Sequence, residues 1–543
     1  MLKKIKIVFS VSILFFSLSG IGRLWSCTSV LVTKGASKDG STMISYSCDG
    51  EFHPHLRMIP AADHKPGETV EIRNWYGKKG KIPQVAHTYK VLGLMNEYQL
   101  AIGETTFDGR LELVNKDGLF NYFTLMLTTL QRAKTAREAI DVMTSLVEKY
   151  GYGSSGESFS IADKNEVWIM EMMGTGKGGT GAVWVAVKIP DGYISAHTNM
   201  SRIGGFPLKS PDVKYSKNVI SFAIEKGIYN PKTDGKFNFS RVYNPPTEEQ
   251  VRYSLRRVWS IFRRSAPSHN YSPDFSSFKK GAKPYPLYIK PDNKLGVRDV
   301  IALHRDHYEG TEFDMTKNLT SGPFNAPDKW RPMKWSAGGK LYSWERPIAT
   351  QQAGFVFVSQ SRSSVPDEIG GVYWYGPDNP YTNFFVPLYT SISKLPESYT
   401  KGSLRRFSRD SAWWAFNFVA NYANLRWNYM IKDIQKVQKE IEDLEFDLQP
   451  VIEEASFKML KDGKKELLKK YLTKYCVENA EMNVKKWWKL SEFLITKYND
   501  GYIQDVKGRP HQTGYPEKWL KKEVKVNGKK LKLKQERKGK GDL

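Results

Sequence analysis

Cys27 could serve as a nucleophile, because it is a cysteine and because the 26 residues before it could be removed as a signal peptide. A thiolate attacks a carbonyl carbon readily, but a free thiol with a pKa near 8.5 is mostly protonated at neutral pH and needs a base. If Cys27 were the first residue of a mature chain, its own α-amine, with a pKa of about 8, would be that base. The amine could then return the proton to a leaving amine. One residue would thus combine nucleophile and base for breaking an amide bond.

The first 26 residues have the order of a secretory signal peptide. Three lysines within the first six residues precede an apolar run, residues 7–18, that only serines interrupt, and the small Ser26 stands just before Cys27. This run is shorter than the roughly 20 residues that span a bilayer, so a cleaved signal is favoured over a permanent membrane helix. The pattern predicts an exported protein, periplasmic, cell-surface or extracellular, that begins at Cys27.

Two other fates of Cys27 are open. Residues 24–27 partly resemble a bacterial lipobox, in which the cysteine is lipidated on its sulfur and its amine. That would leave a non-enzymatic, lipid-anchored surface protein, although Trp25 and Arg23 fit a lipobox poorly. Cleavage at an earlier position would make Cys27 an ordinary internal residue.

Composition indicates a folded globular protein of 543 residues with 40% hydrophobic and 13% aromatic content. Its net charge of +25 is partly concentrated in the last 23 residues, where ten Lys and Arg face three acids. We expect a solvated basic terminus, with a loose association with the cell surface as the alternative. Nucleic acid is not an expected partner of an exported protein. The other two cysteines, Cys48 and Cys476, either pair or remain buried free thiols.

The residues after Cys27 predict a β-hairpin that would fix the start of the mature chain. Residues 27–33 are short, β-branched and apolar, residues 36–40 end in the turn signal Asp39-Gly40, and residues 42–48 return as a second strand. A terminus held in a sheet has a defined position, which catalysis at a terminus requires.

Short motifs follow one another in a characteristic order between residues 27 and 390. They are Cys27-Thr-Ser, residues 38–43 (Lys-Asp-Gly-Ser-Thr-Met), Asp49, Asn96-Glu97, residues 101–107 (Ala-Ile-Gly-Glu-Thr-Thr-Phe), Thr198-Asn199, Arg202-Ile203, residues 306–311 (Asp-His-Tyr-Glu-Gly-Thr) and residues 374–376 (Trp-Tyr-Gly). In this order, and after a signal peptide, they resemble the C69 dipeptidases. These are N-terminal nucleophile hydrolases related to penicillin V acylase and bile salt hydrolase.

The resemblance implies a role for each matching residue. Cys27 corresponds to the nucleophile, and Asp49 to the aspartate that holds the amine and thiol of the cysteine. Asn199 corresponds to the asparagine whose side-chain amide helps to form the oxyanion hole, with a backbone N–H near Glu104 or Thr105 as the second donor. Donors of this kind stabilise the tetrahedral intermediate.

One position departs from the acylase relatives, which carry an arginine three residues before the aspartate. Here that position is Tyr46, so an arginine would have to come from elsewhere, with Arg202 as the candidate, or be absent. Without the resemblance, Asp49 reads as a turn cap, Asn199 as a loop residue and Glu104 as a solvated acid at a strand end.

Two histidine pairs, His53/His55 and His304/His307, raise the question of a metal. Neither has the helical H-E-x-x-H spacing of zinc peptidases, so structural or substrate-contact roles are favoured. We expect no metal and no other cofactor.

The expected fold class is α+β. The resemblance implies a four-layer αββα N-terminal nucleophile hydrolase sandwich, which would occupy residues 27–400 and follow the signal peptide, residues 1–26. Thr135 and Thr247 open helices in it, and residues 157–199 form several strands. A helical region, residues 401–510, and a basic tail, residues 511–543, follow.

Within the helical region, residues 408–448 predict one long helix whose apolar residues repeat every three or four positions. This helix either packs on its own domain or forms a coiled-coil seam, so an oligomer is possible. Pro450 is expected to interrupt it, and residues 453–498 to supply further helices.

The function predicted is that of a secreted cysteine dipeptidase acting on dipeptides or short peptides, with Glu104 or Asp108 pairing with the free amino end of the substrate. An N-acyl amide hydrolase, similar to the penicillin and bile-salt acylases, is the alternative within the same chemistry. The sequence does not define the side-chain preference.

Overall fold

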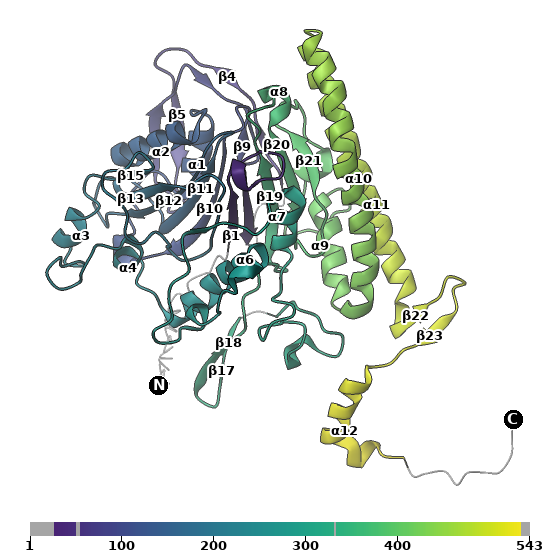
Figure 1. The fold of residues 1–543 in the computed structure, drawn as a ribbon. Helices are drawn as coiled ribbons and strands as arrows, with labels where there is room; N and C mark the ends of the chain where they lie inside the picture. Colours follow the sequence, from purple (N-terminus) through teal and green to yellow (C-terminus); the bar gives the residue numbers. More distant parts are fainter. Residues whose placement is uncertain (1–26, 50–54, 331–332, 534–543) are drawn as a thin grey trace, which may run out of the picture.

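The computed structural model describes residues 27–49, 55–330 and 333–533. Two antiparallel sheets form its centre (Figure 1). The predicted signal peptide, residues 1–26, and His53 lie outside the described residues. The α+β class and the C-terminal helical region are confirmed.

The first sheet has seven strands. In spatial order they are β16 (Tyr288–Ile289), β14 (Ile194–His197), β1 (Thr28–Val32), β2 (Met43–Asp49), β19 (Ala353–Gln360), β20 (Val372–Pro377) and β21 (Val386–Tyr389). The predicted hairpin is present as β1 and β2, which pair with Thr28 opposite Ser47. Cys27 stands one residue before β1 and is therefore fixed by a strand that has neighbours on both sides.

The second sheet has eight strands. In spatial order they are β15 (Val213–Tyr215), β13 (Ala182–Lys188), β12 (Val167–Gly174), β11 (Gly156–Ala162), β10 (Ala101–Asp108), β9 (Met95–Asn96), β8 (Val91–Leu92) and β3 (Met58–Ile59). In the described residues, four two-stranded sheets lie outside the two large ones: β4 (Ala62–Asp63) with β7 (His87–Thr88), β5 (Thr69–Arg73) with β6 (Lys79–Pro83), β17 (Lys334–Ala337) with β18 (Lys340–Ser343), and β22 (Tyr502–Gln504) with β23 (Pro510–Gln512).

The two sheets meet at the strands that carry the candidate site, because β1 and β2 contact β10, and β2 also contacts β11. Helices α1 (Tyr122–Leu130) and α2 (Ala136–Tyr150) pack on the eight-stranded sheet. Helix α7 (Val297–His304) packs on β2 and β19 of the other sheet. Helices thus contact each of the two sheets, and the four-layer αββα sandwich stays a prediction.

Threonine caps begin both helices predicted from the sequence. Thr135 Oγ1 accepts the N–H of Glu138 at 3.2 Å at the start of α2. Thr247 Oγ1 accepts the N–H of Gln250 at 3.2 Å at the start of α5 (Glu248–Gln250). A π-helical turn, Val251–Leu255, joins α5 to α6 (Arg256–Ser265). The remaining short helices are α3 (Ser221–Glu225), α4 (Phe239–Tyr243) and α8 (Asp367–Gly370).

The C-terminal region differs from the expected single helix over residues 408–448. It contains α9 (Ala412–Ala423), α10 (Trp427–Lys461) and α11 (Lys465–Lys497), and the first two are separated at Arg426. Arg426 leaves the helical conformation, and its guanidinium donates to the Gly501 carbonyl and to Thr513 Oγ1. The expectation that Pro450 interrupts the helix is wrong, because α10 continues through it. Proline removes one backbone hydrogen bond, and packing of the residues around it offsets that loss.

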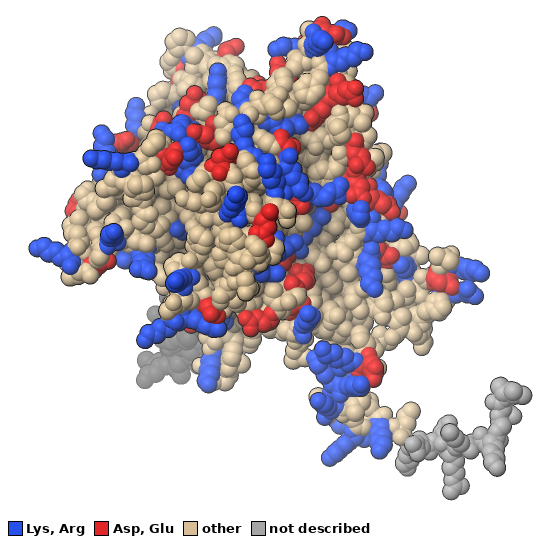
Figure 2. All heavy atoms as spheres, in the orientation of Figure 1, with Lys and Arg blue, Asp and Glu red and all other residues tan. Residues whose placement is uncertain are grey.

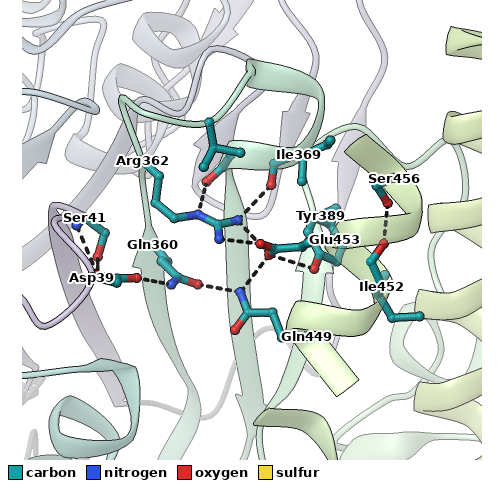
Figure 3. A network of polar contacts seen from close by, with 12 residues as sticks. Asp39, Ser41, Gln360, Arg362, Ile369, Tyr389, Gln449, Ile452, Glu453 and Ser456 are labelled. Atoms are coloured by element: carbon teal, nitrogen blue, oxygen red, sulfur yellow. Dashed lines mark hydrogen bonds and ion pairs between the residues drawn. The ribbon is translucent and has the colours of Figure 1, made fainter. Parts of the chain in front are cut away.

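Buried polar contacts fasten α10 to the seven-stranded sheet (Figure 3). Arg362, just after β19, donates to both carboxylate oxygens of Glu453 at 2.7 and 2.8 Å, and Tyr389 Oη of β21 donates to the same carboxylate at 3.0 Å. Gln449 Nε2 donates to Gln360 Oε1 and to Glu453 Oε1, both at 3.0 Å. The long helix therefore packs on its own domain, and α11 lies against both α10 and β21.

The last helix of the described residues is α12 (Glu517–Leu531), in a region where the sequence predicted only a basic tail. Its apolar residues Leu520, Val524 and Leu531 are exposed on one face, and lysines cover much of the remainder. Figure 2 shows these lysines as a dense basic group at the end of the molecule. Among the helices of the described chain, none combines the length and the apolar composition that crossing a bilayer needs.

Candidate functional site

Cys27 lies in the interior, with 2% of its surface exposed. Its Sγ is 3.8 Å from the hydroxyl of Tyr46 and 3.8 Å from Glu104 Oε1. Burial raises the pKa of the Cys27 thiol well above its usual value, and the neighbouring Cys48 thiol and Glu104 act in the same direction. The thiol is therefore protonated at neutral pH, and any reaction through it needs a nearby base.

Tyr46 occupies the position at which the sequence departs from the acylase pattern. Its hydroxyl donates to Glu104 Oε1 in a short hydrogen bond. Glu104 is completely buried in β10, so the expectation of a solvated acid at a strand end is wrong. Burial raises the pKa of Glu104, and burial together with Glu104 raises the pKa of Glu157 on the adjacent strand β11. Tyr46 and Glu104 thus adjoin the thiol, and Glu157 adjoins Glu104.

Asp49 ends β2 and forms a buried ion pair with Arg346, in which each side chain is 2% exposed. Its other carboxylate oxygen, Oδ1, is buried and accepts no hydrogen bond. Burial lowers the pKa of Arg346 to about 9, and a charge on Cys27 would favour the charged guanidinium. Asp49 directly follows Cys48, the neighbour of the Cys27 thiol, in β2.

Asn199 connects to Cys27 through Arg257. Its Nδ2 donates to the Thr106 carbonyl at 2.7 Å, and its Oδ1 accepts Arg257 Nη2 at 2.7 Å. The same guanidinium donates through Nη1 to the Cys27 carbonyl and to Thr28 Oγ1, the latter at 2.8 Å. These contacts fix the orientation of the Asn199 amide beside β10.

Arg257 was not found by sequence reasoning. It lies in α6 directly after the π-helical turn, and it is completely buried. Arg256 and Arg257 form a basic pair in an amphipathic helix, which usually indicates a solvated face. A π-helical turn occurs often at functional sites, but it leaves no clear mark in one sequence.

Thr105 and Arg202, also considered from the sequence, make contacts that hold the fold together. Thr105 Oγ1 donates to the Thr198 carbonyl at 2.7 Å and lies 2.7 Å from His197 Nδ1. Burial lowers the pKa of His197 to about 3, so the ring is neutral. Arg202 donates to the backbone carbonyls of Ala196, Pro286 and Leu287. The arginines beside Cys27 are Arg257 and Arg346, and Arg202 holds β14 to the chain that leads into β16.

The histidines considered for a metal have separate partners. His55 Nε2 is 2.8 Å from the Gly402 carbonyl, and His304 Nε2 is 2.7 Å from Ser45 Oγ. His307 Nδ1 is 3.2 Å from Glu309. Within residues 27–49, 55–330 and 333–533, no group of three or more histidine, cysteine or acidic side chains could hold a metal ion. Cys48 and Cys476 are both buried free thiols and do not pair.

The chain thus combines a buried cysteine at the junction of two sheets with an aspartate, an asparagine and two arginines around it, an arrangement suited to hydrolysis through a thiol. Comparison with known families identifies the group. The family model described as Peptidase family C69 matches residues 26–440, and the protein belongs to this family. The match begins one residue before Cys27 and ends inside α10.

Curated relatives carry dipeptidase names. A probable dipeptidase of Salmonella dublin is 25% identical over 414 residues, which cover 72% of this chain and 87% of the relative. A probable dipeptidase of Latilactobacillus sakei is 28% identical over 411 residues, covering 72% of this chain and 79% of the relative. Dipeptidase A of Lactobacillus helveticus is 24% identical over 436 residues, covering 75% of this chain and 83% of the relative.

Proposed function

We propose that this protein is an exported cysteine dipeptidase whose nucleophile is the thiol of Cys27, freed as the first residue when residues 1–26 are removed. The observation that carries the proposal is the setting of Cys27 between the two sheets, where Arg257 joins its carbonyl to the Asn199 side chain. The start of the family match at residue 26 and the dipeptidase names of the relatives support it.

The free α-amine of Cys27 supplies the missing base in this proposal. Burial disfavours an ammonium as well as a thiolate, so a buried amine is largely neutral near pH 7 and can accept a proton. The unmatched Oδ1 of Asp49 is a suitable partner for this amine, because it is a buried acceptor in need of a donor. This oxygen supports the proposal, because processing would create the donor that it lacks.

The reaction then runs in two halves. The α-amine takes the thiol proton, sulfur bonds to the substrate carbonyl carbon, and the carbonyl oxygen gains the negative charge. The amide of Asn199 stabilises that oxygen, and the positive charge of Arg257 lies nearby. The C–N bond breaks as the α-ammonium protonates the leaving nitrogen. Water, deprotonated by the amine, hydrolyses the thioester and releases the acid as the thiol regains its proton.

Glu104 and Asp108 are the two acids considered as partners of the substrate ammonium. Glu104 is buried and accepts the Tyr46 hydroxyl, so it is already engaged. Asp108 lies at the exposed end of β10, two residues beyond Thr106, which holds Asn199. We therefore assign the ammonium to Asp108. Cleavage of N-acetyl dipeptides as fast as free dipeptides would contradict this assignment and favour the N-acyl amide hydrolase instead.

The N-terminus and mass of the mature exported protein test the proposal directly. A chain that begins at Cys27 with a free amine, cleaves dipeptides, and loses that activity as Cys27→Ala with processing intact would support it. A diacylglyceryl group on Cys27, or a start at another residue, would overturn it and favour the lipid-anchored or internal-residue alternatives. In the same preparation, the fraction of the protein that stays with the cell surface tests whether the protein associates loosely with that surface.

A further inference from the structure

A cavity of about 700 Å³ lies beside the Cys27 thiol. Tyr46 and Cys48 of β2 form part of its wall, and the hydroxyl of Tyr46 is 3.8 Å from Cys27 Sγ. The volume falls within the range of sites for small organic ligands, roughly 300–1,000 Å³. The cavity therefore shares Tyr46 with the surroundings of the Cys27 thiol, and it is large enough for substrate side chains.

The inner wall of this cavity is apolar and largely aromatic. Phe355, Tyr373 and Tyr375 contribute from β19 and β20, and Tyr122 contributes from α1. Tyr46 packs edge-on against Phe355, with ring centroids 5.7 Å apart, and Tyr373 stacks on Tyr375 at 5.9 Å. Such rings bury large apolar groups and make specific contacts with other rings.

Among the lining residues that the structure describes, charge is confined to the mouth. The charged lining residues Arg57, Lys394 and Glu397 are all exposed and carry both signs. Trp75 also stands at the mouth, 53% exposed, with its ring 4.6 Å from that of Tyr122. An exposed tryptophan over an aromatic cavity is an unfilled contact surface rather than part of the core.

We propose that this cavity receives a bulky apolar side chain of the peptide substrate, preferably an aromatic one, next to the bond that is cleaved. The proposal rests on the proposed function and adds the substrate class to it. An apolar side chain gains free energy by leaving water for this wall, whereas a charged one would lose its hydration with no buried partner. Dipeptides with phenylalanine or leucine at one position should be preferred over those with alanine, lysine or aspartate there.

The first experiment compares kcat/KM for Ala-Ala with two series, X-Ala and Ala-X, where X is Phe, Leu, Lys or Asp. At one of the two positions, Phe should exceed Ala by at least about tenfold and exceed Lys and Asp by more. Equal rates for apolar and charged X at both positions would overturn the inference while leaving the dipeptidase intact. Failure to cleave any dipeptide, with a free Cys27 amine verified, would count against the proposed function.

Two cavity variants with a matched control locate the preference. Met58→Asp places a charge on the cavity wall and should lower the Phe-to-Ala ratio at least about tenfold, and Trp75→Ala at the exposed mouth should lower it with little effect on folding. Leu208→Asp makes a similar change at a side chain 52% exposed outside the cavity and should leave the ratio unchanged. Unchanged ratios in folded Met58→Asp and Trp75→Ala would overturn the inference.

Binding to a catalytically inactive chain separates the cavity from the chemistry. Calorimetry on the processed Cys27→Ala protein should give tighter binding for Phe-Ala or for Ala-Phe than for Ala-Ala, and Trp75→Ala should reduce that difference. This measurement tests the cavity even if no dipeptide is cleaved, and equal binding of all three dipeptides would overturn the inference.

Discussion

Arg257 Nη2 donates to Asn199 Oδ1 at 2.7 Å, and Nη1 of the same guanidinium donates to the carbonyl oxygen of Cys27. One side chain from α6 thus sets the position of the strand that carries the thiol and the orientation of the amide proposed for the oxyanion hole. A planar guanidinium can serve both acceptors at once, whereas a lysine ammonium is a single point on a flexible stem.

Arg257→Lys should therefore lower kcat/KM by about 10²-fold, because the remaining charge cannot hold both groups. Steady-state kinetics with dipeptides, together with thermal unfolding, checks this. Arg256→Lys is the matched control, since Arg256 is a buried arginine of the same helix that donates to Ser276 and Ser277 instead. Equal losses of activity in the two variants would show that the effect of Arg257 is only structural.

Asp49→Asn should lower the free energy of unfolding by about 3 kcal/mol, because it leaves the charge of buried Arg346 uncompensated. It should also slow turnover of the processed enzyme by weakening the partner of the α-amine. Denaturant unfolding and kinetics report on the two effects. A double-mutant cycle with Arg346→Met separates them: the stability loss should shrink in the double variant, and the loss of turnover should remain. Full recovery of turnover would contradict the role for the amine.

Asp378→Asn should stabilise the protein at alkaline pH. Burial raises the pKa of the Asp378 carboxyl to about 7, and Asn417 Nδ2 donates to this carboxyl at 3.2 Å. A carboxyl whose pKa is higher in the folded state favours folding while protonated. This contribution is lost as pH rises from about 4 to about 7, at roughly 1.4 kcal/mol per pH unit. Asparagine has no such loss and tolerates the left-handed φ of 63° at this residue.

The measurement is the free energy of unfolding of both proteins between pH 4 and pH 8. The variant should gain on the wild type with rising pH, by up to about 4 kcal/mol at pH 8. Asp410→Asn, at an exposed position, should follow the wild-type curve. Parallel curves for Asp378→Asn and the wild type would refute the prediction.

Glu453→Gln should weaken the attachment of α10 and lower the free energy of unfolding by about 3 kcal/mol, because buried Arg362 loses its counter-charge. Glu454→Gln changes the next residue, which is exposed, and should alter stability by less than about 0.5 kcal/mol. Hydrogen exchange of α10 and α11 should rise in the first variant and not in the second. Wild-type exchange in Glu453→Gln would show that apolar packing alone holds these helices.

Local signals made the hairpin of β1 and β2 and the capped start of α2 predictable, because a turn dipeptide and a capping threonine act within a few residues. Arg346 and Arg257 could not be predicted, since they reach Asp49 and Cys27 from positions about 300 and 230 residues away in sequence. The prediction at Pro450 was wrong because proline usually ends a helix, whereas here Gln449 and Glu453 on either side of it form hydrogen bonds to residues of the sheet and its end. Where tertiary contacts competed with the local conformational preference of a residue, the tertiary contacts determined the structure.

Strand β21 is the last strand of the seven-stranded sheet, and α10 and α11 both contact it. An uncovered edge strand of buried, apolar character is a template for pairing with another chain. Val386, Leu388 and Tyr389 of β21 are fully buried beneath these helices. The matched family segment ends within α10, so α11 adds cover beyond it. The helical extension thus guards this edge of the sheet against strand-to-strand aggregation.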